Sequence, residues 1–191
     1  MAYQLEFAEE RVLRDECARQ IGRHKGSAVE LRRAYDALNE LAVISQSVVS
    51  QAYNEYRQIY LEAFQIYNRG DLQNAEVLAR AVKHLCRAAW FDAKIKQLES
   101  HSEDLPHLPG LNESPLSGIE QGIFEVESRL SRLKLTGLSD RFGGRARKHL
   151  QCIRMLADRN SLLADTFMKA AYEYCLATEM LHKIEFKVAA A

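Results

Sequence analysis

The chain has 191 residues, of which 47% are hydrophobic and 27% charged, and its formal net charge is zero. This composition is typical of a folded globular domain and is too apolar for a disordered chain. With only 9 Gly and 3 Pro, the sequence has too few turn residues for an all-β fold. A net charge of zero also provides no overall field to attract nucleic acid or a membrane.

The cysteines are spread along the chain, each in an apolar helical context, and they are Cys17, Cys86, Cys152 and Cys175. No Cys-x-x-Cys pair indicates a zinc or redox site. We therefore expect reduced core thiols, as in a cytoplasmic protein. No stretch approaches the roughly 20 apolar residues that span a bilayer, so the sequence predicts no transmembrane segment.

Apolar residues recur at helical spacing over residues 3–21 and again over residues 27–68. Ser27 followed by Glu30 predicts a capping box at the start of the second helix. Because residues 27–68 contain no Gly or Pro, we expect one helix of about 60 Å at about 1.5 Å per residue. A kink is the alternative at residues 45–50, where Ser and Val are poor helix formers.

The Gly70-Asp71 pair predicts a tight turn. Gly70 can take the left-handed conformation that ends a helix, and Asp71 can cap the next helix, which we expect to end near Glu99. So short a turn makes the two flanking helices antiparallel neighbours. Residues 100–117 contain all three prolines and several acidic residues, which predicts a linker.

Further helices are expected over residues 118–135 and 145–188, separated by a glycine-containing break over residues 136–144. The last helix has a candidate interruption near Asn160. The sequence thus predicts an all-α bundle of about five helices, several of them long and antiparallel. In this prediction the first 99 residues form an N-terminal half, and residues 118–191 pack on the same bundle as one domain.

Charge is segregated in the second half of the chain. Residues 99–127 contain seven acidic residues and no Lys or Arg, whereas residues 129–159 contain nine basic and two acidic residues. The Gly143-Gly144 pair before a helix start can present backbone N–H groups to an anion. The candidate anion-binding or partner-binding residues of this basic hinge, residues 141–149, are Arg141, Arg145, Arg147, Lys148 and His149. The alternative is that the hinge pairs with the acidic linker, in the same chain or in a partner subunit.

Two other patterns have structural explanations. Tyr53, Tyr56, Tyr60 and Tyr67 share one helical face, which is typical of a core or an oligomer seam but also of a stacking platform for bases. A single Glu-x-x-His step ends at His182, whereas di-iron bundles need two such steps and two further Glu residues. We therefore predict no metal site and no cofactor, and the residues themselves indicate no catalytic constellation.

A segment around the predicted turn, Tyr67-Asn68-Arg69-Gly70-Asp71-Leu72-Gln73-Asn74-Ala75, lies within residues 53–98. It resembles the helix–turn–helix hairpins of tetratricopeptide repeats and HEPN domains. This resemblance implies an α-helical hairpin. HEPN nucleases carry an Arg and a His on one helix, and the resemblance therefore offers Arg80 and His84 as catalytic candidates.

The long apolar stripes lead us to expect a non-enzymatic helical bundle that binds proteins and self-associates. Its contact region would be the charge-segregated part, residues 99–159. The alternative is nucleic-acid binding by the basic hinge, with or without HEPN-like RNase activity. A third possibility is contact of the same basic residues with anionic lipid.

Overall fold

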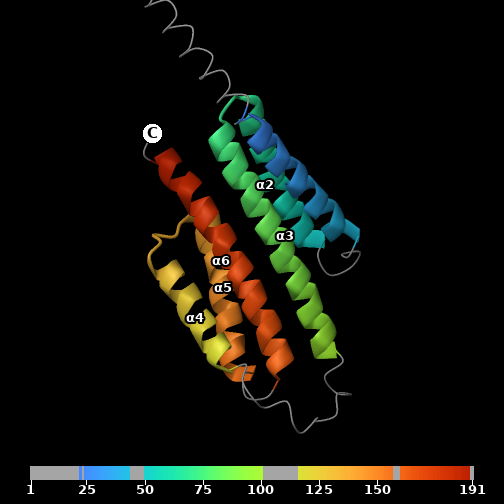
Figure 1. The fold of residues 1–191 in the computed structure, drawn as a ribbon, viewed down its shortest axis with the longest axis vertical. Coiled ribbons are helices and arrows are strands. Elements are labelled where there is room, and N and C mark those ends of the chain that lie inside the picture. Colours follow the sequence, from blue (N-terminus) through green and yellow to red (C-terminus); the bar gives the residue numbers. More distant parts are fainter. Residues whose placement is uncertain (1–21, 23, 44–49, 101–115, 157–159, 190–191) are drawn as a thin grey trace, which may run out of the picture.

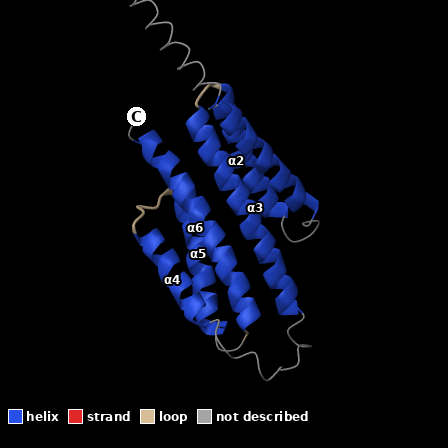
Figure 2. Ribbon diagram, in the orientation of Figure 1, coloured by secondary structure: helices blue, strands red, loops and turns tan. Residues whose placement is uncertain are grey.

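The computed structural model describes residues 22, 24–43, 50–100, 116–156 and 160–189. These residues form six helices and no strand (Figure 2). The first described helix covers residues 24–43, and the next two are α2 (Ser50–Asn68) and α3 (Leu72–Ser100). The predicted all-α bundle is confirmed. The predicted helix over residues 3–21 lies outside the described residues.

The second half of the chain supplies α4 (Leu116–Ser131), α5 (Gly137–Leu156) and α6 (Ser161–Ala189). Figure 1 shows α3 and α6 side by side and antiparallel along the long axis of the molecule. The helix over residues 24–43 and α2 flank one side of this central pair, and α4 and α5 flank the other.

Small side chains allow the two central helices to approach closely. Nine of the described alanines on α3 and α6 are almost fully buried, and they are Ala75, Ala79, Ala81, Ala88, Ala89, Ala164, Ala170, Ala171 and Ala177. Larger core residues such as Leu85 and Leu181 fill the space between the alanines. Burial of such a stripe contributes most of the stability of a helix in a bundle.

The prediction of one unbroken helix over residues 27–68 is wrong. Ser27 Oγ donates a hydrogen bond to the carbonyl of Leu72 at 3.0 Å, and the rings of Tyr35 and Tyr60 are 6.0 Å apart. These contacts require the chain to reverse direction between residues 43 and 50. Ser27 also lies inside the first described helix, and its hydroxyl bonds to α3, so the predicted capping box is wrong as well.

The predicted turn between α2 and α3 is confirmed. Gly70 has a φ of 87°, which a residue with a side chain rarely adopts. The Asn74 amide donates to Asp71 Oδ1 at 3.2 Å, so Asp71 caps α3 as expected. Two adjacent residues, Gly70 and Asp71, thereby fix the end of α2 and the start of α3.

The predicted break between the helices exists, but it lies at residues 132–136 rather than 136–144, because α5 begins at Gly137 and passes through both later glycines. A Cβ on Gly143 would lie 2.6 Å from Leu135 Cδ1 and 3.4 Å from Thr178 Cγ2. Gly143 therefore serves a close approach of α5 to its neighbours. The expected interruption near Asn160 is confirmed, since Asn160 Oδ1 accepts from the Leu163 amide at the start of α6.

Candidate functional site

The basic hinge lies within α5, and some of its residues face the interior of the bundle. Arg141 Nη1 forms an ion pair with Glu55 Oε1 of α2 at 2.8 Å. Arg145 Nη2 donates to Glu55 Oε2 at 3.1 Å, and its Nη1 donates to the Tyr56 hydroxyl at 3.2 Å. The Glu55 side chain is only 12% exposed, so one buried carboxylate binds two guanidinium groups. These partners come from α2, whereas residues 101–115 of the predicted acidic linker lie outside the described residues.

His149 is held at both ring nitrogens. Its Nδ1 lies 2.8 Å from the Arg145 carbonyl, and its Nε2 lies 2.6 Å from Asp92 Oδ1 of α3. Both neighbours are hydrogen-bond acceptors, and a protonated imidazole can donate to both. Asp92 Oδ2 also accepts from the Tyr174 hydroxyl at 2.6 Å. This arrangement orients His149 and leaves neither ring nitrogen directed at a substrate.

Aromatic rings fill the space beside these charges. Tyr56 and Tyr174 are almost fully buried, and their hydroxyls lie 3.4 Å apart. The Phe142 ring stacks on Tyr174 with centroids 6.3 Å apart and an angle of 10° between the rings. Burial raises the pKa of Tyr56 to about 12, and burial together with Tyr56 and Asp92 raises the pKa of Tyr174. Both phenols therefore stay neutral in this junction of α2, α3, α5 and α6.

Two residues of the basic hinge lie in solvent. Arg147 and Lys148 are exposed, and neither has an ion-pair or hydrogen-bond partner among the described residues. The amides of Gly143 and Gly144 lie inside α5, where backbone N–H groups donate hydrogen bonds within the helix. The structure therefore does not contain the predicted glycine-rich helix start, and it separates the five basic-hinge residues into an inner and an outer group.

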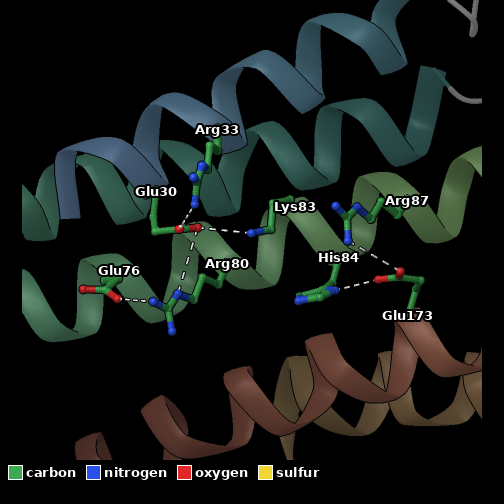
Figure 3. A network of polar contacts seen from close by, with 8 residues as sticks. All are labelled: Glu30, Arg33, Glu76, Arg80, Lys83, His84, Arg87 and Glu173. Carbon is green, nitrogen blue, oxygen red and sulfur yellow. Dashed lines mark hydrogen bonds and ion pairs between the residues drawn. The ribbon is translucent and has the colours of Figure 1, made fainter. Parts of the chain in front are cut away.

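The residues that the HEPN resemblance offers lie on α3 in a second polar network (Figure 3). Arg80 Nη2 pairs with Glu76 Oε1 at 2.5 Å. His84 Nδ1 lies 2.6 Å from Glu173 Oε2 of α6, and both side chains of that pair are at most 15% exposed. Arg80 and His84 thus share one side of α3, and each contacts a different carboxylate.

Glu30 connects the first described helix to this network. Its carboxylate accepts from Arg33 at 2.7 Å and from Lys83 at 3.2 Å, and Arg80 Nε lies 3.9 Å away. Burial by itself would raise the pKa of Glu30, but the hydrogen bonds from Lys83 and Arg33 outweigh it and lower the pKa. Glu30 is therefore a charged link between two helices that are distant in sequence.

A groove with a volume of about 1110 Å³ lies beside this network, bounded by the first described helix, α3 and α6. Apolar side chains remain open to solvent along it, including Val43 at 80% and Trp90 at 43% exposed. Lys94 Nζ lies 5.6 Å from the Trp90 ring centroid. The groove walls carry both signs of charge, from Asp36 and Glu40 on one side to Lys83 and Arg87 on the other.

Polar side chains of α4 form ion pairs with α6 and with α5. Arg129 donates to both carboxylate oxygens of Glu179 at 2.7 and 2.9 Å, and this hydrogen bonding is the main cause of its raised pKa. Glu179 of the Glu-x-x-His step is therefore bound to a guanidinium. Arg154 of α5 pairs with Glu127 of α4 at 2.6 Å. This last pair joins the acidic and basic segments that the sequence separates.

Comparisons with protein-family models, with curated proteins and with solved structures give no significant match. The part of the chain that the structure describes contains no group of three or more His, Cys, Asp or Glu residues arranged to hold a metal ion. Within the same residues, no helix is long and apolar enough to cross a membrane. Function must therefore be inferred from the surfaces and networks themselves.

Sequence reasoning did not identify the acidic partners of the basic hinge. Glu55 lies 90 residues from Arg145, and Asp92 lies 57 residues from His149. By residue type alone, a Glu or Asp on a helix is expected to be solvated, whereas the Glu55 side chain is only 12% exposed. The one available signal is that Glu55 and Asp92 adjoin the apolar stripes of α2 and α3, at the edge where a partner helix packs.

Proposed function

We propose that this chain is a helical-bundle interaction protein that binds other proteins and self-associates, rather than an enzyme. The observation that carries this proposal is the contrast between its polar and apolar side chains. The candidate chemical groups Arg80, His84, Arg145 and His149 are each paired with a carboxylate of the same chain. Large apolar groups, in contrast, are left exposed on several helices.

The exposed apolar residues support protein contacts because the transfer of apolar surface from water into an interface is favourable. Phe124 is 74% exposed, Met155 is 68% exposed and Trp90 is 43% exposed. Burial of such side chains provides roughly 1.5–3 kcal/mol each, and aromatic residues and Met are enriched in interfaces. A partner that covers any of these positions would gain this free energy.

Site-specific photo-crosslinking in the native cells tests this proposal. A photoreactive amino acid replaces Trp90 or Phe124 in turn, and Glu62, an exposed residue of α2, is the matched control position. We expect discrete protein adducts from Trp90 or Phe124 and none from Glu62. Absence of adducts at both apolar positions, with normal expression, would contradict a protein-interaction function.

A second candidate function rests on the outer group of the basic hinge. Arg147 and Lys148 are exposed and have no partner among the described residues, so they can bind phosphate groups of a nucleic acid. Fluorescence anisotropy with labelled single-stranded RNA and duplex DNA, at low and high salt, measures such binding. Salt-sensitive binding that is lost in the Arg147→Glu/Lys148→Glu variant would support this function over protein interaction. Cleavage of the RNA that requires Arg80 and His84 would support the RNase alternative.

A further inference from the structure

One face of α4 carries an acidic row with an apolar centre. Glu120, Phe124 and Glu127 follow one another at spacings of four and three residues, which places them on the same side of the helix. All three are exposed, and Phe124 is 74% exposed. This row points away from the core residues of α4, such as Val126 and Leu130.

One face of α5 carries a basic row with the same spacing. Arg147, Gln151 and Arg154 follow at four and three residues and are all exposed. Met155, next to Arg154, is 68% exposed. The inner residues Arg145 and His149 belong to the opposite side of α5, so the basic row is independent of the buried network.

The ion pair between Glu127 and Arg154 joins the two rows into one surface. We call this surface the α4–α5 face, and it consists of Glu120, Phe124, Glu127, Arg147, Gln151, Arg154 and Met155. Glu127 and Arg154 neutralise each other at its centre, at 46% and 52% exposure. Glu120 and Arg147 have no partner among the residues that the structure describes. The face therefore has one unpaired acid on α4 and one unpaired base on α5.

The positions of the unpaired charges indicate the partner. Because α4 and α5 run antiparallel (Figure 1), Glu120 near the start of α4 and Arg147 in the first half of α5 lie toward opposite ends of the face. The two-fold axis of a face-to-face dimer lies in the plane of the interface, and an axis perpendicular to the line from Glu120 to Arg147 exchanges these two ends. Glu120 of one copy then meets Arg147 of the other, twice, and the exposed Phe124 of each copy is covered by the other copy. A surface that matches its own rotated copy is the requirement for an isologous dimer.

We propose that two copies of this chain associate through the α4–α5 face. This inference rests on the proposed interaction function and names one of its partners as a second copy. The 16 residues of α4 extend for about 24 Å at about 1.5 Å per residue, which makes this a small interface. The dimer is accordingly concentration-dependent, and salt weakens it because the Glu120–Arg147 pairs lie near solvent.

Sedimentation equilibrium of the full chain over a concentration series tests the dimer by charge exchange. Glu120→Arg and Arg147→Glu each place like charges against one another and should raise the dissociation constant at least tenfold. The double variant restores opposite charges and should recover the dimer. Glu62→Arg and Arg57→Glu on α2 are the matched controls, and circular dichroism verifies that every variant is folded.

The outcomes separate this inference from the proposed function. A monomer at every concentration, or a double variant that stays as weak as the single variants, would overturn the dimer through this face. Photo-crosslinks from Trp90 in that case would leave the interaction function intact. A dimer that the exchanged charges do not affect but that Trp90→Ala weakens would also overturn the α4–α5 face and would support self-association elsewhere.

Discussion

The inner and outer faces of α5 carry the same kinds of residues in very different surroundings. On the inner face, Arg145 and His149 contact acids and aromatic rings from α2, α3 and α6. On the outer face, Arg147 lies in solvent, two residues away from both Arg145 and His149 in the sequence. One turn of helix is enough to separate a structural network from a surface.

This difference shows how a basic segment is divided between stability and binding. A buried charge is costly unless it is paired and hydrogen-bonded, so the inner face is tied to Glu55 and Asp92. A solvated charge contributes little to stability and stays available to a partner. Substitutions on the inner face should therefore affect folding, and those on the outer face should affect association.

The largest difference in the free energy of unfolding is expected between alanine substitutions of two phenylalanines. Phe142 is fully buried and its ring packs against those of Tyr56 and Tyr174, so Phe142→Ala should lower the free energy of unfolding by about 3–5 kcal/mol. Phe124→Ala should change it by no more than about 0.5 kcal/mol, because that ring is exposed. Urea unfolding of dilute protein measures both, and equal losses would contradict the comparison.

A smaller loss of stability is expected when Asp92, the acid that binds His149, is removed. Asp92→Ala leaves His149 and Tyr174 without their carboxylate partner, which should cost about 1–3 kcal/mol. Asp165 pairs with Lys169 one turn away, with both side chains about half exposed, so Asp165→Ala should cost about 0.5 kcal/mol or less. Thermal unfolding distinguishes the two, and a harmless Asp92→Ala would mean that the inner network does not stabilise the bundle.

Much of the fold follows from local sequence signals, but its long-range contacts do not. Gly70 and Asp71 specify the turn into α3 because they affect only adjacent residues. The reversal between residues 43 and 50 has no Gly or Pro to mark it, so a continuous helical period hides it. The local pattern predicts a helix break at Gly143, whereas the actual role of this glycine depends on Leu135 and Thr178 in the folded state.

The same limit applies to the candidate site. The sequence indicates a basic hinge, and helical periodicity can separate Arg147 from Arg145 and His149 on the other side of the helix. It cannot indicate that Glu55 and Asp92 meet the inner residues, since no local pattern connects positions 57 to 90 residues apart. Only the folded bundle, in which side chains of α2 and α3 reach those of α5, brings these charges together.

Alkaline pH should weaken the inner junction selectively. Burial raises the pKa of Tyr56 from 10.0, the ordinary value for a tyrosine, to about 12. Because the unfolded chain releases this proton first, the stability that the neutral phenol contributes is present below pH 10 and is lost as pH rises toward 12. Urea midpoints from pH 8 to about 11.5 should therefore fall, and Tyr56→Phe should make the decline shallower, while Tyr35→Phe on the surface should not. An unchanged slope in Tyr56→Phe would mean that its phenol is not the group that titrates.

The smallest effect on stability is expected where the effect on association is largest. Arg147→Ala removes a solvated guanidinium and should change the free energy of unfolding by no more than about 0.5 kcal/mol, whereas Arg145→Ala leaves Glu55 with one guanidinium fewer and should cost about 1–3 kcal/mol. The order reverses for self-association, because Arg147 faces the proposed partner and Arg145 does not. Urea unfolding and sedimentation equilibrium of the same two variants measure the effect of each residue on stability and on self-association. If Arg147→Ala destabilised the fold as much as Arg145→Ala did, the two faces of α5 would not be divided between folding and binding.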